Sequence, residues 1–364
     1  MALGKQGDTK GKLFLSWDQI PRSPGHVFYD RLQGILRKNG FDRFAEELCK
    51  PYYSCGKGRP SIPPGRYFRM HLVGYFEGIE SERGIQWRCA DSLSLRDFLL
   101  LDTEQSVPDH STLSRTRSRL PIEVHHKVFA WVLQVITQEG LIQGERIGVD
   151  SSTMEANAAM RTITRKDTGE GYQQMLHRLA EESGMKTPNL EDLSRMDRKR
   201  KGKKLSNKDW ESPTDPEAKI ARMKDGRTRL AYKPEHAVDL DTGAVVAVEV
   251  HPADKGDTKT LGKTLDKTKA NLDAVGKAPT PDDPSDMLGD KGYFGRAIVK
   301  DLDGGPWKTR IAEPKRKGLN WWNGDHEARR AVYNNRVRLD TGKGKELAKR
   351  RTEYCERSFQ HCLD

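Results

Sequence analysis

The stretch Ile147–Thr153 (IGVDSST) places one acidic residue, Asp150, inside a short apolar run, where a buried strand normally has no use for a carboxylate. A second acid, Asp290, closes a similar run in Met287–Tyr293 (MLGDKGY). A third candidate, Glu356, lies on a basic helical stretch near the C-terminus. Two adjacent strands and a helix crossing nearby would bring these carboxylates together, so they anchor the interpretation of the whole chain.

Carboxylates grouped in this way suit a hard cation. Mg²⁺ prefers oxygen ligands in near-octahedral geometry, usually one or two carboxylates completed by water and substrate phosphate. Two such ions (Mg²⁺ or Mn²⁺), roughly 4 Å apart, can clamp an in-line displacement at phosphorus. Glu353 is the alternative third ligand, because it lies on the same helix face as Glu356. Phe359, which we expect to pack inward, favours Glu356.

The charge of the chain indicates a polyanionic partner. The 364 residues include 64 Lys and Arg against 53 Asp and Glu, which leaves a formal net charge of +11. Each Lys or Arg placed on a phosphate releases a counterion, so this excess favours nucleic acid. Combined with the three acids, it indicates metal-assisted phosphoryl chemistry on DNA.

The chain shows no signal of membrane insertion or export. No apolar stretch approaches the roughly 20 residues of a membrane span, and the N-terminus lacks a signal-peptide core. We therefore expect a cytoplasmic, nucleoid-associated protein with no membrane partner. The five cysteines form no C-x-x-C pair, which is typical of reduced thiols and not of a disulfide framework or a zinc site.

Composition and hydrophobic spacing divide the chain into three regions. Residues 1–24 are expected to be a flexible N-terminus, and residues 25–140 a helical domain for DNA binding or dimerisation. Residues 141–364 are expected to form an α/β catalytic domain, interrupted by a basic insertion at about 160–228. Within it we predict strands, a hairpin turning at Asp241–Gly243, and helices at about 258–275 and 345–363.

Several basic residues are candidates for DNA contact. They are Arg115, Arg117, Arg119, Lys291, Lys315, Arg316, Lys317 and Arg357. Asp109, just before the first three, is predicted to cap a helix. Arg357 has an equal alternative as the ion-pair partner of Glu353. Trp321 and Trp322 are expected to pack in a core, with stacking on an unpaired base as the second interpretation.

At this point the sequence resembles a known family, the bacterial insertion-sequence transposases with an RNase H-like DDE domain and a helical N-terminal domain. The resemblance runs from about residue 25 to the end. The blocks that carry it are Tyr52–Ser54, Gly58–Pro64, Pro108–Arg115, Gly148–Ala158, Asp290–Tyr293 and Glu356–Phe359. It implies an RNase H-like mixed sheet flanked by helices.

The resemblance also implies an activity. Asp150, Asp290 and Glu356 would be the catalytic, metal-binding triad, holding two Mg²⁺ or Mn²⁺ ions. The protein would cut double-stranded DNA at the terminal inverted repeats of an element and join it to target DNA. Water would attack first and a freed 3′-hydroxyl second, with no covalent protein–DNA intermediate. A homodimer would form in the DNA complex.

The chain departs from the family in two respects. Related transposases often carry a Tyr–Arg–Glu–Lys pattern around the third acid, whereas Thr352 and Leu363 occupy the arginine and lysine positions here. The chain ends at Asp364, where related proteins continue, so we expect a truncated C-terminal region. The alternatives are therefore an inactive DNA-binding remnant and a metal-dependent nuclease of the same fold. An aspartic protease is rejected, because the triplet Asp241–Gly243 is better explained as a turn.

Overall fold

The computed structural model of the chain describes residues 25–54, 58, 61–102, 104–185, 187–200, 205–223, 225–315, 322 and 324–363. Residues 361–363 are described by their backbone alone. Contacts divide the chain into two compact units, Met1–Trp131 and Val132–Asp364. In the described part of the chain, no helix is both long enough and apolar enough to cross a membrane.

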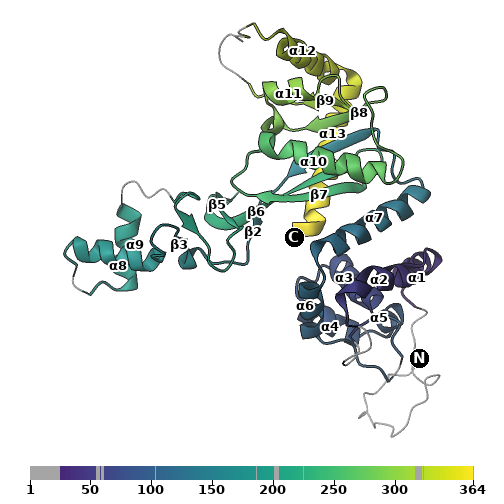
Figure 1. The fold of residues 1–364 in the computed structure, drawn as a ribbon, viewed down its shortest axis with the longest axis horizontal. Coiled ribbons are helices and arrows are strands. Elements are labelled where there is room, and N and C mark those ends of the chain that lie inside the picture. Colours follow the sequence, from purple (N-terminus) through teal and green to yellow (C-terminus); the bar gives the residue numbers. More distant parts are fainter. Residues whose placement is uncertain are drawn as a thin grey trace, which may run out of the picture. The chain divides into compact units, whose positions relative to one another are not determined.

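Helices make up the described part of the first unit (Figure 1). They are α1 (Val27–Lys38), α2 (Phe41–Cys49), η2 (Lys50–Tyr52), α3 (Pro64–Phe76), α4 (Glu82–Ala90), α5 (Leu93–Phe98), α6 (His110–Arg119) and α7 (Ile122–Gln138), the last of which continues into the second unit. Three of these helices are capped at their N-termini by side chains. Ser81, Ser92 and Asp109 each accept a hydrogen bond from a backbone N–H in the first turn of α4, α5 and α6. The predicted cap at Asp109 is thus confirmed.

A buried arginine ties the first unit together. Arg69 on α3 is fully buried, and its guanidinium donates to both carboxylate oxygens of Asp42 at 2.5 and 2.8 Å and to Gln33 at 3.0 Å. A buried charge is tolerated only with such partners. Arg69 therefore links α3 to α1 and α2 inside a core that is otherwise apolar and aromatic.

The second unit is built on a mixed sheet. Its strands are β1 (Arg146–Ser151), β2 (Met154–Glu155), β5 (Lys219–Arg222), β6 (Thr228–Asp239), β7 (Val245–Pro252), β8 (Ser285–Gly289) and β9 (Trp307–Ile311). β1 pairs antiparallel with β6 and parallel with β8, and β9 continues the sheet parallel to β8. β7, β5 and β2 pair antiparallel with β6. The predicted α/β class and the hairpin of β6 and β7 are confirmed.

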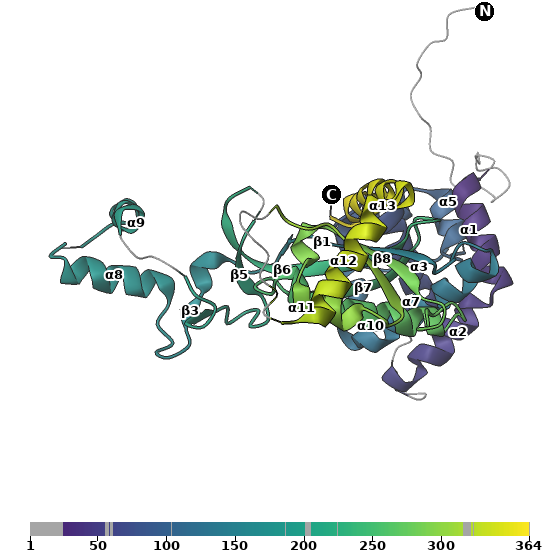
Figure 2. The same ribbon diagram turned by 90° about the horizontal axis from the view of Figure 1, so that it is seen from above.

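Helices cover both faces of this sheet. Figure 2 shows α13 (Gly342–Leu363) on one side of the strands and α10 (Asp257–Asp273) on the other. Successive side chains of a strand point to opposite faces, so β1 divides its residues between the two helices. A Cβ added to Gly148 would lie 3.1 Å from Cys355 Sγ of α13, which places this residue on the α13 face. Ser151 contacts Asp257 on the α10 face at 3.1 Å.

The β9 side of the sheet is completed by α11 (Arg296–Leu302) and α12 (His326–Asp340). The fully buried side chain of Asn335 on α12 bonds both backbone groups of Ile311 in β9. Its Oδ1 accepts from the Ile311 N–H at 2.8 Å, and its Nδ2 donates to the Ile311 carbonyl at 2.9 Å. This double contact fixes α12 against the sheet.

The segment between β1 and β6 carries a small core of its own. It holds η3 (Met160–Thr162), β3 (Thr164–Arg165), α8 (Tyr172–Glu182), α9 (Leu190–Lys199) and β4 (Trp210–Glu211). β3 and β4 form a separate two-stranded sheet. Ile163, Met175, Leu176, Leu193 and Trp210 pack together. The segment joins the main sheet through β5 and the first half of β6.

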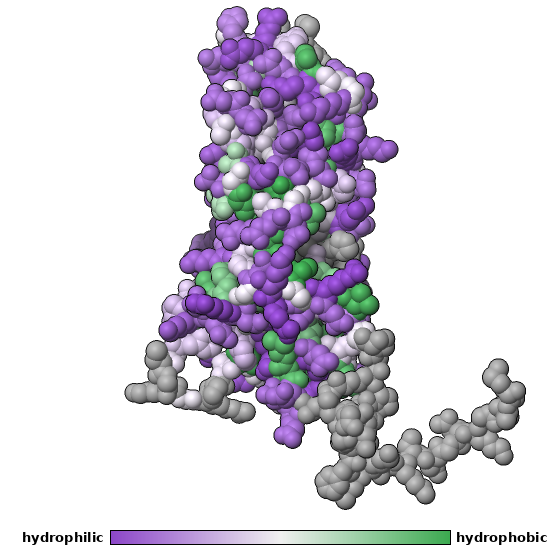
Figure 3. Space-filling view, turned by 90° about the vertical axis from the view of Figure 1, so that its right-hand side faces the viewer, coloured by the Kyte–Doolittle hydropathy of each residue, from purple (hydrophilic) through white to green (hydrophobic). Residues whose placement is uncertain are grey.

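Some elements differ from those expected. The strands expected at 230–232 and 235–240 are one strand, β6, which continues through Pro234. Helices α9, α11 and α12 were not predicted. In α12 the buried residues are only Ala328, Ala331, Val332 and Asn335, so its apolar pattern is weak. The surface is correspondingly polar. The face drawn in Figure 3 is mostly hydrophilic, with scattered apolar groups.

Candidate functional site

Asp150 and Asp290 lie at the same end of two neighbouring parallel strands. Gly148 of β1 pairs in register with Leu288 of β8, and each acid follows two residues later. Neighbouring strands lie about 4.8 Å apart, so the two carboxylates leave the sheet side by side. Asp150 Oδ1 accepts the N–H of Ser151 at 2.9 Å, and Asp290 Oδ1 accepts that of Gly292 at 2.8 Å. The two predicted strand-end acids are therefore placed together.

Glycine in β1 brings α13 close to these acids. A Cβ at Gly148 would lie 2.7 Å from Leu240 Cδ2, and 3.1 Å from Arg351 Cγ and from Cys355 Sγ. A larger residue would clash with Leu240 and would require Arg351 and Cys355 of α13 to shift by a few tenths of an ångström. The close packing allows Arg351 to reach the strand end.

Arg351 pairs with Asp150 from α13. Its Nη2 lies 3.4 Å from Asp150 Oδ1, and only 10% of its side chain is exposed. Its Nε is buried and donates to no acceptor in the described part of the chain. A buried donor without an acceptor costs stability unless something else supplies an oxygen. Arg351 also borders a cavity of about 340 Å³ together with Asp290, Lys291 and Thr352.

Helix α13, which carries the predicted third acid, lines part of this cavity. Ala348 and Thr352 of α13 line it beside Asp290. Glu356 follows Thr352 by one helical turn, so the three residues lie on one stripe of the helix. Glu353 and Glu356 are both exposed, and the Glu353 carboxylate lies 2.8 Å from Arg357 Nη2. Arg357 therefore serves as the ion-pair partner of Glu353, and the assignment of the third ligand to Glu356 stays a prediction.

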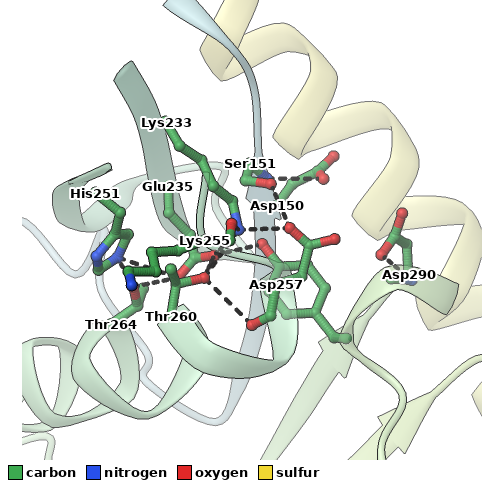
Figure 4. A network of polar contacts seen from close by, with 12 residues as sticks. Asp150, Ser151, Lys233, Glu235, His251, Lys255, Asp257, Thr260, Thr264 and Asp290 are labelled. Atoms are coloured by element: carbon green, nitrogen blue, oxygen red, sulfur yellow. Dashed lines mark hydrogen bonds and ion pairs between the residues drawn. The ribbon is translucent and has the colours of Figure 1, made fainter. Parts of the chain in front are cut away.

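A fourth carboxylate, Asp257, approaches the site from the α10 face (Figure 4). Asp257 Oδ1 accepts the hydroxyl of Ser151 at 3.1 Å and lies 2.5 Å from Lys233 Nζ. A Cβ at Gly292 would lie 2.1 Å from Asp257 Oδ2 and 3.1 Å from Asp290 Oδ1. Only glycine leaves room for both carboxylates at this point. Sequence reasoning missed Asp257, because an acid at the start of a helix is ordinary.

A buried polar network anchors the loop that carries Asp290. Glu235 is fully buried and accepts from Tyr293 at 2.8 Å and from Thr260 at 2.9 Å, with a further hydrogen bond from Thr264. Burial and the Glu235 carboxylate raise the pKa of Tyr293 far above its ordinary value, so this tyrosine keeps its proton and donates it. Tyr293 therefore fixes the turn that follows Asp290 to β6 and α10.

The donor set fits a hard divalent ion. Among the described residues, no three Asp, Glu, His or Cys side chains lie close enough to hold one ion together. The groups that face the strand ends are nevertheless carboxylates and a hydroxyl, the oxygen ligands that Mg²⁺ and Mn²⁺ prefer. Two further features suit a polar ligand: the space that Gly292 leaves between Asp257 and Asp290, and the buried Nε of Arg351 that has no acceptor.

The other candidate DNA contacts are dispersed. Arg115, Arg117 and Arg119 are exposed on α6 of the first unit. Arg117 lies 3.1 Å from Glu82, and Arg119 stacks over the ring of Tyr53. Lys291 and Lys315 are exposed in the second unit. Arg316, Lys317 and Trp321 lie outside the described residues. Trp322 packs near Arg296, whose guanidinium carbon lies 4.6 Å from its ring.

The described cysteines and two histidines are buried. Cys49, Cys89 and Cys355 are free thiols, and burial raises their pKa values to about 11, 12 and 12. The side chains of Cys55 and Cys362 lie outside the described residues. His236 and His251 are 4% and 5% exposed, as structural histidines should be.

Comparison with known proteins gives matches along both units. The family described as "Transposase domain (DUF772)" matches residues 17–119, and the family described as "Transposase DDE domain" matches residues 196–364. The second match contains Asp257, Asp290 and Glu356 and begins after Asp150. None of the curated proteins and none of the solved structures matched the chain.

Proposed function

Because the chain belongs to the DDE transposases of insertion sequences, we propose that it cleaves DNA at the ends of its element and transfers the freed strand to target DNA, using two divalent ions held by Asp150, Asp290 and Glu356. The observation that supports this proposal is the parallel register of β1 and β8, which brings Asp150 and Asp290 to the same end of two neighbouring strands, next to the helix α13 that carries Glu356.

The ions, when bound, would activate the attacking hydroxyl and stabilise the departing oxygen. The chain's own groups hold the geometry. Arg351 fixes the carboxylate of Asp150, and the buried pair of Tyr293 and Glu235 fixes the loop of Asp290. Lys291, exposed next to Asp290, is placed to neutralise the scissile phosphate.

The reaction proceeds in two displacements at phosphorus. Water attacks the phosphodiester at the element end, the bond from phosphorus to the 3′-oxygen breaks, and a 3′-hydroxyl is released. That hydroxyl then attacks a phosphodiester of the target, whose own 3′-oxygen departs. Each displacement forms one P–O bond and breaks one, so no bond to the protein is required.

We further propose that the first unit binds the terminal inverted repeats through α6 and that two copies act together on the two ends. Arg115 and Arg119 lie one helical turn apart and are exposed, so both can reach one DNA backbone. Phosphate contacts of this kind position a protein on DNA without reading its sequence.

A cleavage assay tests the catalytic assignment. DNA carrying the native element ends is incubated with the full chain in Mg²⁺ or in EDTA, and wild type is compared with Asp150→Asn and Asp290→Asn. Each variant should still bind the DNA but lose at least about a hundredfold in cleavage, because a carboxylate that holds an ion is replaced by a neutral amide. Cleavage that persists in either variant, or in EDTA, rejects the metal assignment.

Supplying pre-cleaved element ends with target DNA separates the two displacements. Joining of these ends by wild type supports a transposase. Hydrolysis of intact ends without joining would instead indicate a nuclease of the same fold.

A further inference from the structure

A buried lysine and an acid lie next to the proposed catalytic site without a role in it. Lys233 of β6 is 6% exposed, and its ammonium lies 2.5 Å from Asp257 Oδ1. It also donates to Thr260 Oγ1 at 2.9 Å and to the carbonyl of Lys255 at 3.4 Å, and it lies 3.7 Å from Glu235. A lysine is almost never buried to this extent unless it is paired.

The partner of this lysine is part of the catalytic surroundings. Asp257 binds Ser151, whose backbone N–H donates to Asp150. Its other oxygen faces Gly292, at a point that Asp290 also approaches. Asp257 therefore contacts Ser151, which follows Asp150, and approaches Gly292, two residues after Asp290 (Figure 4).

The charges explain why a lysine belongs here. Asp150, Asp257 and Asp290 bring three negative charges to one end of the sheet, and like charges at such distances repel strongly in a partly buried site. Arg351 compensates on the α13 face and Lys233 on the α10 face. Arg351 and Lys233 thus balance part of the negative charge of the three acids when no divalent ion is bound.

We propose that Asp257 is a fourth carboxylate of the metal-binding site and that Lys233 is its resident counter-ion, which competes with the bound divalent ion. This inference rests on the proposed function of the site. Lys233 reduces the repulsion between the acids in the folded protein. At the same time it lowers the affinity of the site for a divalent ion. Asp257 supplies an oxygen from the α10 face, opposite to the α13 face that presents Glu356.

Ordinary structural roles make different predictions. An acid in the first turn of α10 also stabilises that helix by its charge, and a buried ion pair can serve packing alone. In either case the removal of Asp257 or of Lys233 would lower stability and leave metal affinity unchanged. Competition predicts that the two removals change metal affinity in opposite directions.

The experiment is a calorimetric titration of the full chain with Mn²⁺, without DNA, so that no catalysis is needed. Asp257→Asn should weaken Mn²⁺ binding by about tenfold or more, as loss of a supporting carboxylate commonly does. Lys233→Met keeps the apolar stem and removes the charge, so it should tighten binding by about fivefold. Matched controls on exposed positions of α10, Asp266→Asn and Lys269→Met, should bind as wild type does.

Three results separate the possibilities. Wild-type affinity in Asp257→Asn, or weaker binding in Lys233→Met, overturns the inference. If Asp150→Asn loses Mn²⁺ binding while Asp257→Asn keeps it, the proposed function is retained and the role of Asp257 as a fourth carboxylate ligand is rejected. If Asp150→Asn also binds as wild type does, the proposed function falls as well.

Folding is checked in the same samples. The double variant Asp257→Asn with Lys233→Met removes both members of the ion pair together, so it avoids the unpaired buried lysine that the Asp257 single variant leaves. It should unfold at a temperature near that of wild type and still bind Mn²⁺ more weakly than Lys233→Met does. Equal affinities of the double variant and Lys233→Met would contradict a role for Asp257 in metal binding.

Discussion

Burial sets the protonation state of His236, a residue next to the proposed catalytic acids. His236 pairs with Asp150 across β1 and β6, and its ring stacks on Phe359 with centroids 4.1 Å apart. Its Nδ1 lies 3.1 Å from Ser358 Oγ. Burial lowers the pKa of His236 to about 4, so the ring is neutral in the folded protein near neutral pH.

This neutral histidine predicts a pH dependence of stability. In the unfolded chain the pKa of His236 returns to about 6.5. Between about pH 6.5 and pH 4 the unfolded state binds more protons, so the free energy of unfolding falls as the pH falls, by at most about 1.4 kcal/mol per pH unit. His236→Phe, which keeps the stacking, should therefore reduce the loss of melting temperature between pH 7 and pH 5.

The control for this measurement is an exposed histidine. His177→Phe on α8 should leave the difference between the two melting temperatures as it is in wild type. An unchanged difference in His236→Phe would mean that the histidine is not held neutral by burial.

The individual acids show how far residue-level prediction reached. Asp150 and Asp290 could be found in the sequence. Burying a carboxylate next to an apolar run costs free energy, so an acid at such a position indicates a function. Asp257 could not be found in this way. Its place depends on the missing side chain of Gly292 and on Lys233, which lies well before it in the chain. Only the folded backbone brings these residues together.

Among the elements, α13 decides which glutamate can serve as the third ligand. Its buried residues, including Leu347, Arg351 and Cys355, face the sheet. Thr352 and Ala348 line the cavity beside Asp290, and Glu356 continues that stripe. Glu353 is engaged by Arg357, which supports the proposal that Glu356 is the third ligand.

Exchange of each glutamate tests this arrangement of the helix. Glu356→Gln should reduce cleavage of element ends at least about a hundredfold, because a metal-binding oxygen is lost. Glu353→Gln removes only an exposed ion pair, which contributes at most about 1 kcal/mol, and should cleave within about twofold of wild type. The reverse ranking of the two variants in the cleavage assay would move the third ligand to Glu353.

Elements with a clear apolar period were predicted well. The helix expected at about residues 258–275 is α10, and the hairpin around Gly243 is β6 and β7. α12 escaped prediction because its inward face is made of alanines, one valine and Asn335, so its period is weak. The amide of Asn335 finds its partner only when β9 is in place.

On the scale of the whole molecule, the excess of positive charge predicts a strong dependence of DNA binding on salt. The logarithm of the binding constant should fall linearly with the logarithm of salt concentration, with a slope of about −0.9 for each phosphate contacted. Arg115→Ala and Arg119→Ala should each reduce the magnitude of this slope by about 0.9. The slopes are measured by fluorescence anisotropy with labelled element ends.

A surface arginine of the same unit serves as the control. Arg43 on α2 is 87% exposed and pairs with Glu47 at 2.9 Å. Arg43→Ala should leave the slope unchanged. If all three variants reduce the slope equally, the contact is spread over the surface and α6 has no special part in it.

The double hydrogen bond between Asn335 and Ile311 also has a consequence for how copies of the chain meet. An outermost strand with open N–H and C=O groups invites a strand from another molecule to join it, which leads to aggregation. In β9 the amide of Asn335 occupies these groups at Ile311, much as an additional strand would. Association through continued sheet growth is therefore blocked at Ile311 on this edge of the sheet.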